Sequence, residues 1–342
     1  MAAPTRPGAE EFDRRQPFPV LRWPSPRGLD RGMQLVGPLV ESWKLDEVEW
    51  IECGQALPVG LPAYVLARRW RVPYAIWVHG QELLRARERR VKVLGGAEQL
   101  TRLLLGHAKA VFANSRATAK LAQDFGAPAD RVHVLAPGPL PGGPDPSRAR
   151  GPGLRERYEL GERPLVLSVS RLVPRKGHEV LVRAVAGARE RRPDVALAIV
   201  GEGPDRPRLE GLVRELRLEG HVFLPGRLED AELSQTFAQA TLFALLSHHK
   251  PEKTWWEGFG IVFREAGRFG LPVVATRAGG IPDAVEDGVN GLLVEPDDPD
   301  AAGAALLRIV ENPDLAQRLG EEGRGLAEVQ PDWTLIREVM TA

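Results

Sequence analysis

The stretch PLVLSVSRLVPRKGHEVLVRAVAGARERRPDVALAIVG, residues 164–201, decides the fold. It begins with an almost continuously apolar run, residues 164–170, and ends with a second one, residues 195–201. Between these runs, apolar residues recur at helical spacing: Val180, Leu181, Ala184, Val185 and Ala188. Strands that are apolar throughout are typical of parallel sheets covered by helices on both faces. The stretch therefore predicts a strand, a helix and a second, parallel strand.

The same alternation continues toward the C-terminus. Further apolar runs, HVFLPG (221–226), TLFALLS (241–247) and LPVVAT (271–276), are separated by segments with helical periodicity. A series of such units predicts a doubly wound parallel sheet. Sheets of this kind bind ligands at the carboxyl ends of their strands, so the loops after the strands are the places to search for a site.

The first half of the chain has a similar but less complete pattern. Strand-like runs occur as VEWIEC (48–53), YAIWVHG (74–80), AVFANS (110–115) and VHVLAPG (132–138). A segment dense in Pro and Gly, residues 136–153, can form neither a helix nor a central strand. We therefore predict an N-terminal domain over 1–140, a linker over 141–155, a second domain over 156–330 and a C-terminal segment, 331–342, that packs back towards the first domain.

Length and composition limit the class of function. A chain of 342 residues predicts two hydrophobic cores, because single cores stop growing at roughly 250–300 residues. Acidic and basic residues are equal at 46 each, which favours no nucleic-acid partner. The single cysteine, Cys53, excludes an internal disulfide and predicts a cytoplasmic location. No apolar run approaches the roughly 18 residues that span a bilayer, so we expect a soluble or peripheral protein.

Three cations, Arg171, Arg175 and Lys176, lie between the first strand of the opening stretch and its helix. At this position the backbone amides are unpaired and the helix dipole is positive, so cations repel unless an anion binds. A forked guanidinium and a point-charge ammonium suit a diphosphate. A solvated basic loop would show the same pattern.

A second motif, EGFGIVFRE, places Glu257 and Glu265 on either side of a turn that contains Gly258 and Gly260. The glycines let the backbone approach a ligand, and the second carboxylate is expected about one turn into a helix. Carboxylates are natural partners for sugar and ribose hydroxyls. Acidic residues at the start of a helix also occur without any ligand.

These motifs occur together in a fixed order. SRLVPRKG (170–177), GEGP (201–204), PGRLED (225–230), the Glu257–Glu265 pair and GLPVVATRAGGIPDAVEDGVNGLLVEPDD (270–298) follow one another along the chain. In this order they resemble the retaining glycosyltransferases of the GT-B architecture, in the large family that includes bacterial mannosyltransferases, sucrose synthases and phosphatidylinositol mannosyltransferases. The resemblance implies an α/β fold of two Rossmann-like doubly wound domains that face each other across a cleft, and a hexosyltransferase activity.

The resemblance also implies the roles of individual residues. Two residues are expected to act on the donor sugar: His79 and Glu257. The others are expected to bind the donor nucleotide sugar, which is GDP- or UDP-linked: Arg171, Lys176, Gly201, Arg227, Leu228, Gly258, Phe259, Gly260, Ile261 and Glu265. The sugar transfers with retention, and similarity to the phosphatidylinositol mannosyltransferases favours mannose and a lipid or cell-envelope glycan acceptor.

We expect no metal and no cofactor, because fixed cations and amides can stabilise the departing diphosphate. The sequence DPD at 298–300 has the form of a metal-binding pair but precedes a helical stretch, so we interpret Asp298 as a helix N-cap. His248 and His249 are adjacent and point apart, with no third ligand at a known spacing, so we predict no zinc site.

Two features concern the acceptor side. Relatives open with a strand and a Gly-rich loop, and this chain shows neither before Phe18, so the resemblance predicts a shortened N-terminal domain that lacks both. Residues 83–109 are rich in arginine, which predicts contact with an anionic membrane surface and a peripheral location on the inner membrane face. A solvated helix face would have the same composition.

Two other classes of function stay open at this point. A nucleotide-sugar-binding protein with little or no transferase activity would fit the shortened N-terminal domain. A GT-B epimerase acting on a UDP-sugar would have a similar fold. Epimerases of this class lack the combination of RLVPRKG with a glutamate pair such as Glu257 and Glu265. Turnover of the donor without an acceptor would distinguish the epimerase from a transferase.

Overall fold

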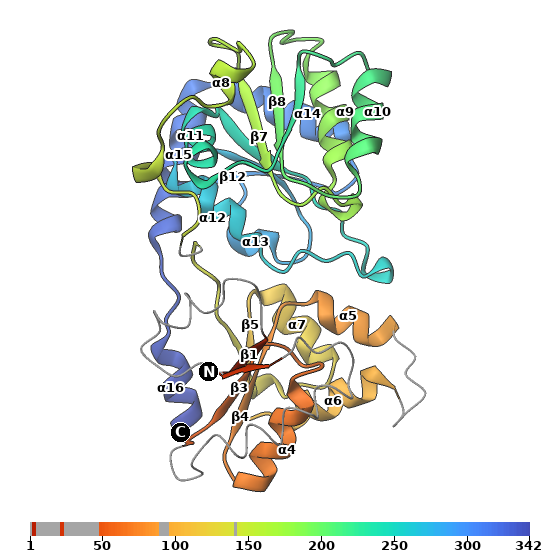
Figure 1. Cartoon of the computed structure of the whole chain (residues 1–342), viewed down its shortest axis with the longest axis vertical. Helices are drawn as coiled ribbons and strands as arrows, with labels where there is room; N and C mark the ends of the chain where they lie inside the picture. The colour runs from red at the N-terminus through yellow and green to blue at the C-terminus, as the bar shows by residue number, and fades with distance from the viewer. Residues whose placement is uncertain (1, 5–20, 24–47, 89–95, 140–141) are drawn as a thin grey trace. The chain divides into compact units, whose positions relative to one another are not determined.

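The computed structural model of the protein describes residues 2–4, 21–23, 48–88, 96–139 and 142–342. The chain divides into two compact units, each of which is described by itself (Figure 1). The first unit contains 1–113, 119–133 and 333–342, and the second contains 114–118 and 134–332.

The second unit is built on a six-stranded sheet in the order β12-β11-β10-β7-β8-β9. All neighbouring strands are parallel, which confirms the predicted doubly wound sheet. The strands are β7 (Leu165–Val169), β8 (Ala196–Val200), β9 (Val222–Gly226), β10 (Leu242–Leu245), β11 (Val273–Thr276) and β12 (Gly291–Val294).

Helices cover both faces of this sheet (Figure 1). The residues of β7 alternate between the faces: Val166 packs into the core on one side, and Leu165 and Leu167 pack into the core on the other. One core is closed by α9 (His178–Ala188), α10 (Arg206–Glu215), α14 (Pro299–Val310) and α15 (Pro313–Glu328). The other is closed by α8 (Leu154–Arg157), α11 (Asp230–Gln239), α12 (Ile261–Arg268) and α13 (Ile281–Ala284).

The strand order reverses at the centre of the sheet. From β7 the chain continues outward to β8 and β9, and it then returns to the other side of β7 with β10. In an open parallel sheet the crevice beyond the carboxyl ends of two such strands is where ligands bind. The loops after β7 and β10 are therefore the ones expected to form a site.

The first unit contains a four-stranded sheet in the order β3-β4-β5-β6, with the recorded pairs β3–β4 and β4–β5 parallel. Its strands are β3 (Ile51–Cys53), β4 (Tyr74–Val78), β5 (Ala110–Ala113) and β6 (Val132–Val134). Its helices are α4 (Gly60–Trp70), α5 (Gln81–Glu88), α6 (Ala97–His107) and α7 (Arg116–Asp124).

The C-terminal helix α16 (Thr334–Thr341) packs on the sheet of the first unit. Met340 is 4 % exposed and contacts Ala75, Ala110 and Phe112 of β4 and β5. The ring of Trp333 lies 6.1 Å from that of Trp77. An apolar helix face therefore joins the end of the chain to the sheet of the first unit.

Two short strands, β1 (Ala2–Pro4) and β2 (Leu21–Trp23), precede this sheet and pair with each other in parallel. They form a two-stranded sheet of their own. The prediction that no strand precedes Phe18 is therefore wrong, because Ala2–Pro4 forms β1. The prediction that a Gly-rich loop is absent before Phe18 falls on 5–17, which lies outside the described residues.

The described part of the Pro/Gly-rich linker is anchored on the second unit. Arg268 donates a hydrogen bond to the carbonyl oxygen of Pro144 at 2.9 Å and pairs with Asp145. The backbone amide of Asp145 donates to Ser234 Oγ at 3.2 Å, and Leu154 is fully buried. The described part of the linker accordingly belongs to the second unit, whose longer segment is Val134–Asp332.

Candidate functional site

The loops after β7 and β10 are in direct contact. Gly177 begins α9 with a φ of 65°, and a Cβ at this position would overlap the carbonyl oxygen of Leu246, the residue after β10. Gly201, with a φ of 138°, packs in the same way against the carbonyl oxygen of Ser170 after β7. Only glycine permits these close approaches, so both glycines hold the loops at the strand ends together.

A buried charge cluster lies between these two loops, and Glu257 is its centre. Glu257 Oε2 accepts hydrogen bonds from Lys176 Nζ at 2.5 Å and from Ser247 Oγ at 3.2 Å, and lies 3.5 Å from a guanidinium nitrogen of Arg175. The side chains of Lys176 and Glu257 are only 11 % and 12 % exposed. We call Lys176, Arg175, Ser247 and Glu257 the switch-point cluster.

The electrostatics of the switch-point cluster favour an ionised carboxylate. Burial alone would raise the pKa of Glu257, but Lys176, Arg175 and the hydroxyl of Ser247 together lower it below its usual value. Burial lowers the pKa of Lys176, and the charge of Glu257 opposes that effect. A single carboxylate therefore faces two cations in a site from which water is largely excluded, so these three side chains together keep a net positive charge that favours an incoming anion.

Arg171 differs from Lys176 in its surroundings. Its side chain is exposed, while its charge is close enough to lower the pKa of Lys176. Arg175 was not predicted as a site residue, although its position in the basic loop was visible in the sequence. Ser247 was also missed, because a lone serine at the end of a strand carries no distinguishing signal.

The segment between the two glutamates leads into α12. This helix begins at Ile261, after Gly260 with a φ of 88°, so Glu265 lies just beyond the first turn, as the spacing predicts. Phe259 is 2 % exposed and its ring packs in the core, so only its backbone can face a ligand. The same turn also contains Gly258, Gly260 and half-buried Ile261.

The remaining predicted residues lie at other strand ends. Arg227 follows β9 and is exposed, whereas Leu228 is 6 % exposed and belongs to the core. His79 follows β4 in the first unit, where it is exposed and its Nε2 lies 3.2 Å from the carbonyl oxygen of Gly54. Its backbone amide donates to Glu82 Oε1 at 2.6 Å, which fixes the turn into α5.

Within the described ranges, no cluster of three or more histidine, cysteine or acidic side chains has the arrangement of a metal site. Asp298 Oδ1 accepts a hydrogen bond from the amide of Ala301 at 2.8 Å and caps α14, which confirms the N-cap interpretation. His248 pairs with Asp297, which also accepts from Lys250 Nζ at 2.8 Å. The ring of His249 faces Trp256 at 5.3 Å. The two histidines therefore face different partners.

Glu265 makes the stability of the protein depend on pH in a predictable direction. Burial raises its pKa, and Arg268 acts in the opposite direction. A raised pKa of an acid contributes stability below the ordinary value, about 4.3, and this contribution is lost as the pH rises through the folded-state value. We therefore expect Glu265→Gln to gain stability relative to the wild type between pH 4 and pH 7, measured by urea unfolding. The control is Glu322→Gln on the exposed face of α15, and equal pH profiles for both variants would contradict the prediction.

Comparison with known proteins now identifies the family. Residues 154–326 match the family model of glycosyl transferases group 1, and residues 1–138 match that of glycosyltransferase family 4. The chain belongs to the group 1 glycosyl transferases. It is therefore a glycosyltransferase, as the motifs predicted.

Two curated relatives are similar to this glycosyltransferase over nearly its whole length. One is the GDP-mannose-dependent alpha-(1-6)-phosphatidylinositol monomannoside mannosyltransferase of Mycolicibacterium smegmatis, 35 % identical over 97 % of this chain and 86 % of the relative. The other, from Corynebacterium glutamicum, is a GDP-mannose-dependent monoacylated alpha-(1-6)-phosphatidylinositol monomannoside mannosyltransferase. It is 29 % identical over 97 % of this chain and 85 % of the relative.

Solved structures show that the glycosyltransferase has the GT-B fold. The Anabaena protein HepE in complex with UDP aligns with a TM-score of 0.78 at 22 % identity, covering 99 % of this chain and 90 % of HepE. Sucrose-phosphate synthase from Thermosynechococcus elongatus aligns with a TM-score of 0.70 at 23 % identity, covering 94 % of this chain and 81 % of the synthase. Among the described residues, no helix is long and apolar enough to cross a membrane.

Proposed function

We propose that this glycosyltransferase transfers mannose from GDP-mannose to a lipid or cell-envelope glycan acceptor, with retention of the anomeric configuration. The observation that carries the proposal is the switch-point cluster, which holds two cations and a carboxylate at the strand ends where a doubly wound sheet binds its ligand. The choice of mannose and GDP is supported by relatives that are named as GDP-mannose-dependent mannosyltransferases.

In this proposal the cations bind the donor diphosphate. Lys176 lies at the start of α9, where unpaired backbone amides also face an anion, and exposed Arg171 precedes it in the same loop. Negative charge develops on the leaving diphosphate as the bond to the sugar breaks, so cations fixed there stabilise the transition state more than the ground state. We propose that no metal is required.

The carboxylates act on hydroxyl groups in this proposal. Glu257 contacts the donor sugar and keeps Lys176 and Arg175 charged, and Glu265 binds the ribose of the nucleotide. Arg227, Leu228 and the backbone of Gly258, Phe259, Gly260 and Ile261 complete the donor pocket, with Gly201 at the turn after β8. His79 contributes from the first unit as the residue that contacts the sugar. The donor phosphate assists removal of the acceptor proton.

The proposal includes a peripheral location on the inner membrane face through residues 83–109. In the described part of this segment, Arg87 lies over the ring of Phe125 at 4.6 Å and Arg102 pairs with Glu98 at 2.9 Å, so both also serve the fold. Arg85 is exposed. Arg89, Arg90 and Lys92 lie outside the described residues.

A direct transfer assay tests the function. Purified protein is mixed with radiolabelled GDP-mannose and vesicles that contain phosphatidylinositol mannoside, with UDP-glucose as the competing donor. We expect labelled lipid from GDP-mannose, and an α-linkage in the product by NMR. Binding of GDP-mannose without any transfer would instead support a nucleotide-sugar-binding protein, and donor turnover without acceptor would support an epimerase.

Two substitutions separate binding from folding. Arg171→Ala is expected to weaken binding of GDP by roughly 1.5–3 kcal/mol, the value of a hydrogen bond to a charged group, and to leave the unfolding free energy unchanged. Lys176→Ala is expected to weaken binding by as much and also to destabilise the fold, because it removes a partner of buried Glu257. Calorimetry and urea unfolding measure both quantities, and unchanged affinity in both variants would refute the role of the cations.

A further inference from the structure

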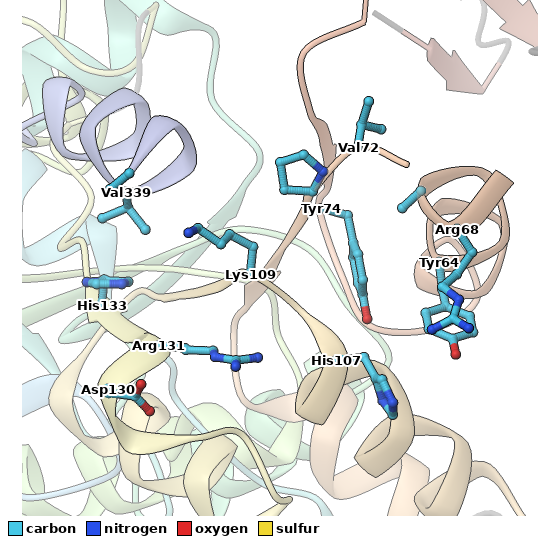
Figure 2. Close-up of a pocket in the computed structure, with 13 residues that line it drawn as sticks. Tyr64, Arg68, Val72, Tyr74, His107, Lys109, Asp130, Arg131, His133 and Val339 are labelled. Atoms are coloured by element: carbon cyan, nitrogen blue, oxygen red, sulfur yellow. The ribbon is translucent and has the colours of Figure 1, made fainter. Parts of the chain in front are cut away.

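A second candidate binding site lies in the first unit, away from the strand ends that carry His79. It is a pocket of about 590 Å³ (Figure 2). Its wall begins with Tyr74, the first residue of β4, and with Lys109, the residue before β5. The other lining residues come from α4, the end of α6, η2 (Ala129–Arg131), β6 and α16. The pocket therefore opens at the amino ends of the parallel strands.

This position separates the pocket from the proposed reaction. His79 follows the carboxyl end of β4, whereas Tyr74 begins the same five-residue strand. At about 3.3 Å per residue, roughly 16 Å of strand lies between them. A ligand in the pocket would therefore lie at the amino ends of the strands, whereas His79 lies at the carboxyl end of β4.

The pocket concentrates positive charge from three separate elements. Arg68 comes from α4, Lys109 from the segment before β5, and Arg131 from η2. Among the described lining residues, Asp130 has an acidic side chain, and Ala342, the last residue of the sequence, adds a main-chain carboxylate. No recorded ion pair in the described part of the chain includes Arg68, Lys109, Arg131 or Asp130. Three cations that face one hollow without carboxylate partners favour an anionic ligand.

The framework around these cations is held in place by hydrogen bonds. The amide of Lys109 donates to the carbonyl oxygen of Tyr74 at 2.9 Å. The hydroxyl of Tyr74 donates to the carbonyl oxygen of Leu104 at 2.6 Å. Arg131 donates to the carbonyl oxygen of Ala108 at 3.3 Å, which leaves other guanidinium N–H groups for a ligand. In Figure 2, Lys109 and Arg131 lie between His133 and Tyr74.

Flat side chains form another part of the wall. The ring of Tyr64 lies 5.7 Å from that of His107, and the guanidinium of Arg68 lies over Tyr64 at 6.0 Å. Burial lowers the pKa of His133, so this imidazole is neutral at pH 7 and can accept or donate a hydrogen bond. Aromatic faces and neutral polar groups suit the organic part of a ligand, and the volume lies within the range of small-molecule sites, about 300–1,000 Å³.

We propose that this pocket binds a small, soluble phosphate monoester such as a sugar phosphate. A phosphate monoester carries a charge of about −1.5 to −2 at pH 7, which suits a pocket whose three cations outnumber its carboxylates. Its phosphate lies against Lys109 and Arg131, and its sugar extends from them towards the ring of Tyr64. The pocket is thus a binding site additional to that of the donor nucleotide.

The test compares ribose 5-phosphate with ribose by calorimetry, using the full chain in saturating GDP so that the donor site is filled. We expect ribose 5-phosphate to bind and ribose not to bind. In the double variant Lys109→Gln/Arg131→Gln, we expect binding to weaken at least about tenfold, because two charged contacts are lost. The matched control is Arg69→Gln, an exposed cation of α4 that does not line the pocket, which should bind as the wild type does.

Each other outcome would overturn the proposal. Equal affinity of the double variant and the wild type would place the ligand elsewhere. Inorganic phosphate that binds as tightly as ribose 5-phosphate would remove the role of the sugar. Binding only to phosphatidylcholine vesicles that contain phosphatidic acid would indicate a lipid surface. Because the wild-type measurement leaves the donor site filled, a failure here is distinct from a failure of the proposed transfer reaction.

Discussion

Glu257→Gln is expected to tighten the binding of free GDP and to slow transfer, two effects of opposite sign. The carboxylate of Glu257 neutralises Lys176 at 2.5 Å and lies 3.5 Å from Arg175 in the ligand-free protein. Once that charge is removed, nearly buried Lys176 loses its carboxylate counter-ion, and a diphosphate that supplies negative charge binds more tightly, by roughly tenfold. The rate falls by about two orders of magnitude because the sugar loses its carboxylate partner.

The same substitution is expected to lower the free energy of unfolding without ligand. Removing one member of a buried ion pair costs about 3–5 kcal/mol, and the remaining exposure of both side chains places the expected loss near the lower value. Saturating GDP should restore part of it. Calorimetry, urea unfolding and single-turnover kinetics measure the three quantities. Glu252→Gln, an exposed acid of the same loop, is the control, and weaker GDP binding by Glu257→Gln would contradict this account.

The fold was largely predictable because the relevant signals are local. Continuous apolar runs identified the strands of the second unit, and residues such as Val180 and Ala184 identified a helix by their spacing. The strand order was not predictable, because alternation along the chain does not say on which side of β7 the later strands pair. The anchoring of the Pro/Gly-rich segment was also missed, since it depends on Arg268, more than 100 residues away.

The candidate site was predictable to the level of its loops. Positions of Arg171, Lys176, Glu257 and Glu265 followed from strand ends, helix starts and the family order of motifs. The ion pair between Lys176 and Glu257 did not, because the two residues are 81 positions apart and only the contact of the two loops brings them together. The two cations also differ in their surroundings, which the sequence does not show: Lys176 is buried and paired, whereas Arg171 is exposed.

Gly177→Ala is expected to be the most destabilising glycine-to-alanine substitution in the loop between β7 and α9. Gly177 has a φ of 65°, and a Cβ there would overlap the carbonyl oxygen of Leu246. The left-handed conformation costs alanine about 1–2 kcal/mol, and overpacking against rigid backbone costs typically about 1–3 kcal/mol more. We therefore expect the free energy of unfolding to fall by roughly 2–5 kcal/mol in urea.

The control for Gly177→Ala lies in the same helix. Gly187 is in the last turn of α9, and a Cβ at this position would have no atom within 4 Å. Gly187→Ala is expected to stabilise the protein by about 0.5–1 kcal/mol, because alanine is the better helix former. Since Leu246 directly precedes Ser247 of the switch-point cluster, a shift forced on it by Gly177→Ala should also weaken GDP binding, whereas Gly187→Ala should leave it unchanged. Normal stability and GDP affinity in Gly177→Ala would show that the two loops need not touch to form the site.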